Sequence, residues 1–161
     1  MQYIIRRAIK EDMNQVHKLI CELAVFENEP DAVKITKETL VQFGIGNNAL
    51  FTCFVAENEG VILGMALVYF RFSTWEGKAL HLEDLIVSNQ YRNKGIGKAL
   101  YNQVMVYADQ EDVNRVEWEV LDWNTNAIDF YEKSGVTFFK DWHLVQMNKN
   151  QLNTYLKSIQ E

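Results

Sequence analysis

The sequence predicts one α/β domain built on a mixed β-sheet, and three observations support this. Strand-like and helix-like segments follow in the order strand, two helices, three strands, helix, strand, helix, strand. The 161 residues, of which 48% are hydrophobic, suffice for one domain with a sizeable core. No repeat, low-complexity tract or linker divides the chain. We therefore expect a single domain over residues 1–161.

The chain begins with a short strand and two helices. β-forming residues predict a strand at 3–6. From 10 to 27, apolar residues recur at helical spacing and predict an amphipathic helix, which ends before Pro30. Thr36 is a favourable N-cap for a second helix that ends near Phe43.

A meander of three strands follows, at residues 51–57, 61–72 and 78–87, with turn residues between them. The remaining predicted elements are a helix from the glycine-bearing loop to about Asp109, a strand at 115–121, a helix at 126–134 ended by Gly135, a strand at 142–147 and a helix at 151–159.

Charge and targeting signals restrict the possible partners. The net charge of -6 disfavours a general attraction to nucleic acid or to an anionic membrane surface. The N-terminus carries no signal-peptide pattern, and no apolar run approaches the ~20 residues that a membrane span needs. We therefore expect a cytoplasmic protein without nucleic-acid or membrane partners.

The cysteines and histidines suggest no metal centre. Cys21 and Cys53 are far apart and form no C-x-x-C pair, which favours two buried free thiols over a disulfide or a redox role. His17, His81 and His143 lack metal-ligand spacing. No metal is expected.

Residues 82–100 combine an apolar strand, a polar turn, a basic glycine-bearing loop and the start of a helix. A helix N-terminus has unpaired N–H groups and a partial positive charge, and neighbouring glycines let a phosphate approach the backbone. The loop matches neither a P-loop nor G-x-G-x-x-G, since Lys98 precedes Ala99 and position 100 is Leu. By itself, the pattern suits a tight turn as well as a phosphate cradle.

Glu83 and Asp84 lie within this otherwise apolar strand. Alternation points the two side chains to opposite faces unless a β-bulge intervenes. A buried carboxylate would have a raised pKa and could transfer protons. Alternatively, one carboxylate faces solvent and the other pairs with a basic neighbour. The residues alone leave both open.

Two residues near the C-terminus have similarly open roles. Tyr131 lies on a predicted helix that faces the sheet, where it could be a core residue. A tyrosine hydroxyl, whose pKa is ordinarily about 10, also suits protonation of a thiolate. Asn124 could cap the helix or hold a ligand.

Together, these segments resemble the GNAT superfamily of acetyl-CoA-dependent N-acetyltransferases, and within it the spermidine/spermine and thialysine acetyltransferase branch. The resemblance covers nearly the whole chain. It rests on residues 19–27, Trp75-x-Gly77-Lys78, Leu82-Glu83-Asp84, the loop at 90–97, and Trp123-Asn124-x-x-Ala127-x-x-Phe130-Tyr131-x-x-x-Gly135.

The resemblance implies a mostly antiparallel GNAT-type sheet with helices on both faces, acetyl-CoA as cofactor and a homodimer. It implies that Glu83, through water, takes a proton from the substrate ammonium, and that Tyr131 protonates the departing thiolate. Whether Asp84 or a water chain is the base instead stays open. The implied coenzyme-binding residues are Leu85, Ile86, Val87, Arg92, Asn93, Lys94, Gly95, Ile96, Gly97, Lys98, Asn124, Ala127 and Tyr131. The implied amine-binding residues are Phe26, Glu27, Trp75, Glu83, Asp84 and Trp142.

The implied reaction is acetylation of a small cationic amine by direct attack in a ternary complex. Lys140 stands where polyamine-acetylating relatives tend to be acidic, which favours a lysine-like amine or short diamine over a long polycation. The alternatives are an enzyme acting on a protein or peptide amine, and a non-catalytic acyl-CoA-binding module.

Overall fold

The computed structural model describes residues 2–160 and separates into two compact units that meet in sequence between Glu119 and Val120. The first unit holds the sheet, and the second holds two helices. Whether the whole chain is one domain stays a prediction. None of the helices in the described part is long and apolar enough to cross a membrane.

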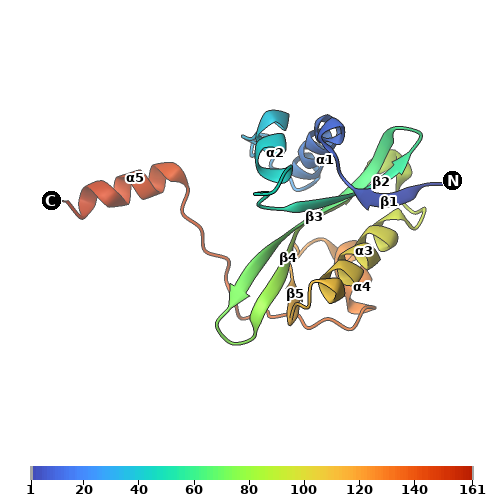
Figure 1. Cartoon of the computed structure of the whole chain (residues 1–161). Coiled ribbons are helices and arrows are strands. Elements are labelled where there is room, and N and C mark those ends of the chain that lie inside the picture. The colour runs from blue at the N-terminus through green and yellow to red at the C-terminus, as the bar shows by residue number, and fades with distance from the viewer. Residues whose placement is uncertain (1, 161) are drawn as a thin grey trace. The chain divides into compact units, whose positions relative to one another are not determined.

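The first unit contains a five-stranded sheet in the order β1-β2-β3-β4-β5 (Figure 1). The first three pairings are antiparallel and the last is parallel, so the predicted mixed, mostly antiparallel sheet is confirmed. Its elements are β1 (Ile4–Arg7), a 3-10 turn (Lys10–Asp12), α1 (Met13–Phe26), α2 (Lys37–Gly44), β2 (Thr52–Asn58), β3 (Val61–Ser73), β4 (Gly77–Val87), a second 3-10 turn (Asn89–Tyr91), α3 (Ile96–Gln110) and β5 (Arg115–Glu117).

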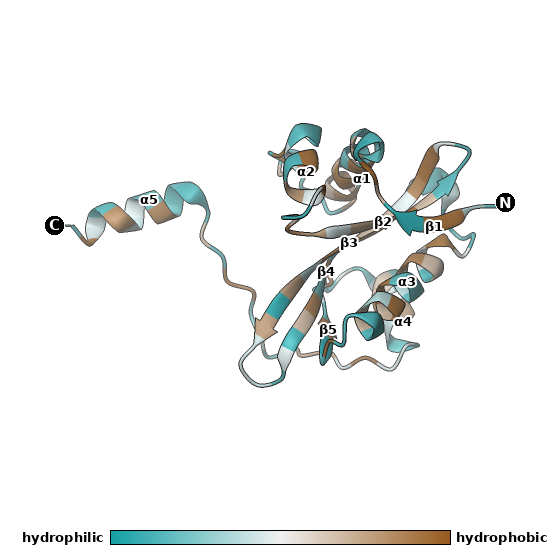
Figure 2. Cartoon of the chain, viewed as in Figure 1, coloured by the Kyte–Doolittle hydropathy of each residue, from teal (hydrophilic) through white to brown (hydrophobic). Residues whose placement is uncertain are grey.

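Helices cover both faces of this sheet, as expected, with α1 and α2 on one side and α3 on the other (Figure 1). Alternation along β2 divides the core: Cys53 and Val55 belong to a buried cluster with residues of α1 and α2. Phe54 lies on the opposite face, where its ring centroid is 5.3 Å from that of Tyr107 on α3. The hydropathy colouring follows this burial, with apolar residues concentrated in the central strands (Figure 2).

A β-bulge interrupts β4 at the carboxylate pair. Leu82 pairs with Val68 and Asp84 with Leu67, so Glu83 is the extra residue on its strand. The bulge breaks strict alternation, which explains how two adjacent acidic residues fit into an apolar strand. Asp84 is half-buried, whereas the Glu83 side chain is 51% exposed.

β4 and β5 pair only briefly. The parallel register covers Ala79 with Arg115, Leu80 with Val116, and His81 with Glu117. Beyond His81, and within residues 2–160, β4 pairs with β3 alone. The strand expected at 115–121 is therefore shorter than predicted, because its ladder ends where the two strands part.

The second unit contains α4 (Thr125–Glu132) and α5 (Lys149–Ser158). The prediction of a strand at 142–147 was wrong, because the described residues between the two helices form no strand. Trp142, Leu144 and Val145 are 72%, 71% and 88% exposed. Their β-forming character is not enough, since a strand needs a neighbour to satisfy its backbone groups and this unit supplies none.

Candidate active site

The loop between β4 and α3 forms a bare helix N-terminus. Gly95 is the N-cap of α3, with a φ of 79°, and no side chain caps it among the described residues. Asn93 is also left-handed, with a φ of 60°. The buried side chain of Ile96 anchors the first turn. The N–H groups of the first turn therefore remain available to an anion.

Contacts from α1 and β4 fix this loop. Glu22 Oε1 accepts a hydrogen bond from the backbone N–H of Asn89 at 2.7 Å. Arg92 Nε donates to the carbonyl oxygen of Val87 at 3.2 Å. The guanidinium of Arg92 lies 5.2 Å from the ring centroid of Phe26. The loop is thus held in place before any ligand arrives.

The backbone of this loop is open to an anionic group such as a phosphate. A Cβ at Gly95 would meet nothing within 4 Å, and one at Gly97 would meet only Val87 Cγ2 at 3.6 Å, so the backbone is approachable. Lys94 and Lys98 are exposed beside it and add positive charge. A phosphate at this position would accept N–H donors and would lie at the positive end of the helix dipole.

The edge of β4 that follows His81 offers a second binding feature. Leu85, Ile86 and Val87 pair with Ala66, Met65 and Gly64 of β3 on one side. On the other side, β5 has already ended at Glu117. An extended ligand with amide groups can add to such an edge as a strand does.

The surroundings of Glu83 favour its charged form. The interactions with His81 and with the hydroxyl of Tyr69 lower the pKa of the Glu83 carboxyl, although partial burial opposes them. His81 Nε2 lies 3.5 Å from Glu83 Oε2. Glu83 is therefore an anion at neutral pH.

Asp84 has the opposite environment. Burial, followed by the negative charges of Glu83 and Glu27, raises the pKa of Asp84 to about 7. Burial also raises the pKa of Glu27. These three carboxyl groups form an acidic cluster at the end of α1 and the middle of β4, suited to a cation.

A polar network that the sequence prediction missed surrounds Glu83. His81 is 3% exposed, and Arg71 Nη1 lies 3.1 Å from His81 Nδ1. Arg71 Nη1 also lies 2.8 Å from Glu117 Oε1. Strand alternation in the sequence could have predicted this network. Residues 69 and 71 on one strand, and 81 and 83 on the next, are polar and two positions apart, which is typical of one polar face.

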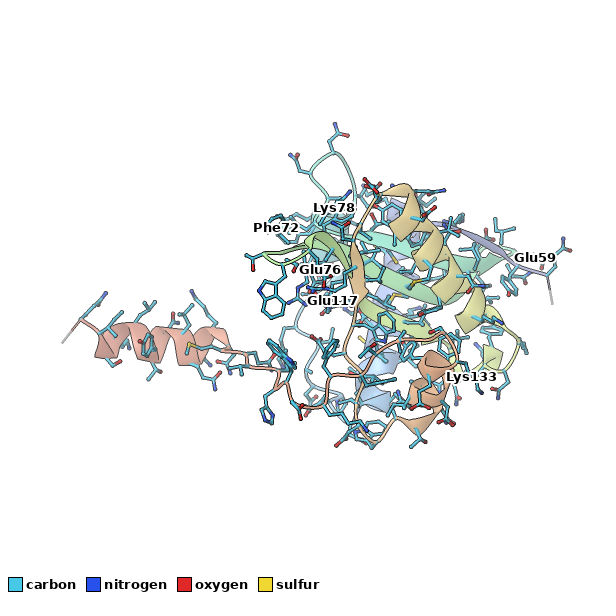
Figure 3. The ribbon with its side chains drawn as sticks, turned by 90° about the horizontal axis from the view of Figure 1, so that it is seen from below. Glu59, Phe72, Glu76, Lys78, Glu117 and Lys133 are labelled. Carbon is cyan, nitrogen blue, oxygen red and sulfur yellow. The ribbon has the colours of Figure 1, made fainter. Side chains whose placement is uncertain are left out.

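Further ion pairs tie this network to the hairpin end of the sheet. Arg115 contacts both Glu76 Oε2, at 3.6 Å, and Glu117 Oε2, at 2.8 Å. Figure 3 labels Glu76, Lys78 and Glu117 at this end of β4 and β5. These charges are structural neighbours of the candidate site.

Four of the predicted residues belong to the second unit. Asn124 is the N-cap of α4, and its Oδ1 accepts from the backbone N–H of Ala127 at 3.3 Å, so the capping role is confirmed. Tyr131 is 7% exposed, and its ring centroid is 5.2 Å from that of Phe130. Trp142 is exposed. The ligand roles predicted for these residues stay predictions.

Trp75 is not brought next to Glu83 in the first unit. It lies in the β3–β4 hairpin turn, beyond the last pair Ser73–Gly77, and is 83% exposed. The structure brings together Phe26, Glu27, Glu83, Asp84 and the loop at 92–97, and leaves Trp75 apart from them.

The two cysteines are free thiols in different environments. Cys21 and Cys53 are both free, which confirms the expectation of two thiols. Cys53 is buried, and its burial raises its pKa far above neutrality, so it stays a thiol. Cys21 is only half-buried, in contrast to the prediction. In the described part of the chain, no group of three His, Cys, Asp or Glu residues could hold a metal ion.

The site thus combines an uncapped helix N-terminus, an open strand edge and, on that strand, the carboxyl groups of Glu83 and Asp84. Comparison with known proteins gives the class. The profile of the acetyltransferase (GNAT) family matches residues 13–136. The chain therefore belongs to the GNAT family and is an N-acetyltransferase.

Individual relatives agree. The chain is 36% identical over 151 residues to a thialysine N-epsilon-acetyltransferase of Sus scrofa, covering 87% of this chain and 89% of that protein. It is 33% identical over 158 residues to a human spermidine/spermine N(1)-acetyltransferase-like protein 1, covering 92% of this chain and 23% of that protein. A solved integron cassette protein from Vibrio cholerae has the same fold, with a TM-score of 0.77 at 22% identity over 98% of this chain and 99% of that one.

Proposed function

We propose that this enzyme transfers the acetyl group of acetyl-CoA to the primary amine of a small cationic substrate. The observation that carries the proposal is the placement of an acidic cluster, formed by Glu27, Glu83 and Asp84, on and beside the strand that leads into the bare N-terminus of α3. A cation and an anionic coenzyme would thus meet along β4.

Acetyl-CoA, when bound, supplies an acetyl group activated as a thioester. In our proposal, backbone N–H groups from Arg92 to Gly97 hold its pyrophosphate, helped by the dipole of α3 and the charge of Lys98. Backbone groups of Leu85–Val87 pair with the pantetheine arm, and Asn124 and Ala127 contact the same arm.

The amine needs a proton acceptor before it can react. A primary ammonium with a pKa of about 10 has almost no free lone pair at pH 7, and each unit of mismatch costs about 1.4 kcal/mol. We assign this role to Glu83, acting through water, because its carboxyl is anionic and half-exposed. Asp84 is the alternative base, since its pKa of about 7 matches the operating pH.

The proposed transfer needs no enzyme nucleophile. After Glu83 has accepted the first proton, the amine nitrogen would bond to the acetyl carbon and the carbon–sulfur bond would break. Tyr131 would donate a proton to the leaving sulfur, and the second proton of the amine nitrogen would return to Tyr131 as the amide forms. Phe26, Glu27 and Trp142 are proposed to line the amine side. Trp75 is not included, because it lies in the β3–β4 hairpin turn, apart from Phe26 and Glu27.

The substrate is proposed to be a lysine-like amine or a short diamine. The relative named for thialysine N-epsilon-acetylation supports a lysine-like substrate that is acetylated on its side-chain amine. The positive charge of Lys140 would repel a long polycation.

We also propose a homodimer, which the exposed apolar residues Trp75, Trp142 and Val145 support. Two free thiols support a cytoplasmic location.

The test is a turnover assay with acetyl-CoA against thialysine, lysine, diamines, spermidine, spermine and an N-terminal peptide, followed by release of free thiol. We expect the highest kcat/KM with thialysine or a short diamine. Turnover of the peptide alone would favour a protein-acetylating enzyme. No turnover with any amine, while acetyl-CoA still binds, would indicate a non-catalytic acyl-CoA-binding module.

A further inference from the structure

His81 is a buried imidazole with polar groups at both ring nitrogens. Tyr69 and Arg71 of β3 lie on one side of it, and the Tyr69 ring centroid is 5.0 Å away. Carboxylates approach from the other side: Nε2 is 3.5 Å from Glu83 Oε2 and 3.9 Å from Glu119 Oε2. Glu117 completes the charged groups by binding Arg71.

The partner at Nδ1 determines the tautomer of His81. A guanidinium has only donors, so Arg71 Nη1, at 3.1 Å, must donate to a lone pair on Nδ1. The single ring proton of a neutral imidazole is then on Nε2, which faces Glu83. Glu117 orients Arg71 for this role through its 2.8 Å ion pair.

We propose that His81 is a positioning residue for acetyl transfer, in which Arg71 fixes the Nε2–H tautomer and that N–H, with the Tyr69 hydroxyl, aims the carboxylate of Glu83. The proposal rests on the proposed function, since it assigns a task to Glu83 as proton acceptor. His81 itself touches neither substrate nor coenzyme in this scheme.

A neutral donor suits this task better than a cation. A lysine or a charged histidine would neutralise Glu83 and compete with the substrate ammonium. A neutral N–H holds the carboxylate oxygen while its negative charge remains available to a cation. The bulge at Glu83 strengthens the need for such a support, because a bulged residue lacks regular ladder contacts on its own strand.

The experiment compares His81→Phe with His81→Gln. Phenylalanine fills the space but donates nothing, whereas the amide N–H of glutamine can take the place of Nε2–H. We expect His81→Phe to lower kcat about tenfold, the effect of losing one charge-assisted hydrogen bond, and to move the acid limb of the kcat/KM profile to higher pH. In His81→Gln, kcat and the position of the acid limb should both be close to the wild-type values. The KM for acetyl-CoA should stay unchanged in both variants.

A purely structural role would give a different result. Val68→Ala, at a fully buried position of β3, serves as the packing control, because it should lower Tm without moving the pH profile. If Glu83→Gln removes turnover but His81→Phe leaves the acid limb of the pH profile unmoved, the positioning role is overturned. The proposed function would remain intact in that case.

The tautomer can be checked without any turnover. Nitrogen-15 NMR of histidine-labelled protein, with His81 assigned from the His81→Gln variant, should show the proton on Nε2. A proton on Nδ1 would overturn the proposal. If the wild-type enzyme shows no turnover with any amine, the proposed function fails first, and the role given to His81 fails with it.

Discussion

Glu83 and Asp84 are neighbours in sequence but differ in the state of their carboxyl groups. Hydrogen bonds lower the pKa of Glu83, while burial and two negative charges raise the pKa of Asp84 to about 7. Two adjacent carboxyls whose pKa values are pushed apart can divide charge and proton transfer between them. The pair therefore provides a permanent anion and a group that titrates at neutral pH.

Glu83→Gln should lower kcat by about 100-fold or more, because it removes the proposed proton acceptor. Steady-state thiol release measures the effect. The matched control is Glu119→Gln, which removes a carboxylate 3.9 Å from the same His81 nitrogen. A comparable loss in the control would show that the charge of the network, rather than Glu83 itself, is what turnover needs.

Tyr131→Phe should lower kcat about tenfold or more, because the leaving sulfur loses its proposed proton donor. The dissociation constant of acetyl-CoA should change less than about twofold. Tyr155→Phe, on the exposed surface of α5, is the control for the loss of one hydroxyl. An unchanged kcat in Tyr131→Phe would remove this residue from the mechanism.

Asp84→Asn tests the raised pKa through stability. A carboxyl whose pKa is higher in the folded protein stabilises the fold below its unfolded pKa, and this contribution is lost as the pH rises through the folded value of about 7. We expect the variant to melt about 2–4 °C above the wild type at pH 8, which corresponds to roughly 1 kcal/mol, and the difference to shrink at pH 5.

The control for this measurement is Asp122→Asn, which neutralises an exposed carboxylate. Its melting temperature should follow that of the wild type at both pH values. A gain in Asp84→Asn that is equal at pH 5 and pH 8 would contradict the raised pKa.

At the scale of elements, α3 and its preceding loop hold the proposed coenzyme cradle. Gly95 needs a left-handed backbone, whereas Gly97 lies inside the helix. The two glycines therefore serve different ends: one allows the turn, and the other allows close approach of a ligand.

Gly95→Ala should destabilise the fold by about 1–2 kcal/mol, because alanine resists a φ of 79°. It should also raise the KM for acetyl-CoA by distorting the loop. Gly97→Ala should keep or raise Tm, since alanine favours helix, yet still weaken coenzyme binding. Thermal unfolding together with a binding titration separates these effects. Unchanged binding in both variants would argue against a pyrophosphate at this loop.

Most elements were predictable because their signal is local. Periodicity placed α1 and α3, and Thr36 capped α2 as expected, with its hydroxyl accepting from the backbone N–H of Thr39 at 3.3 Å. The bulge at Glu83 was not predictable, since it depends on the register against β3. The strand predicted at 142–147 failed for the same reason: a strand is defined by a partner, and partners lie elsewhere in the chain.

The candidate site likewise has features that the sequence predicts and features that it does not. The loop at 92–97 and the carboxylates were visible in the sequence as patterns. The opposite shifts of Glu83 and Asp84 were not, because burial and cross-strand neighbours produce them. The tautomer of His81 depends on Arg71, ten residues away, and only the pairing of β3 with β4 brings the two together.

At the scale of the whole molecule, the acidic net charge bears on the substrate, and the exposed apolar side chains bear on the oligomeric state. The net charge of -6 favours a cationic substrate over nucleic acid. Phe139, Trp142, Leu144 and Val145 form a run of exposed apolar residues, which soluble proteins usually cover.

We expect light scattering to give the mass of two chains of 18.8 kDa each. Val145→Asp should shift the protein towards the monomer, because a charge resists burial in an apolar interface. Asn150→Asp adds the same charge at an exposed polar position of α5 and should leave the mass unchanged. A monomeric wild type at micromolar concentration would refute the homodimer.

The three-residue ladder between β4 and β5 has a consequence for the lifetime of the enzyme. Beyond His81, β4 is hydrogen-bonded to β3 on one side only. A ligand that pairs with its free edge as a strand does would therefore stabilise the sheet. A ligand that binds only the folded chain adds about 2.7 kcal/mol of stability at a concentration 100 times its Kd. If acetyl-CoA binds this edge as proposed, the resistance of the enzyme to proteolysis should increase with the concentration of acetyl-CoA.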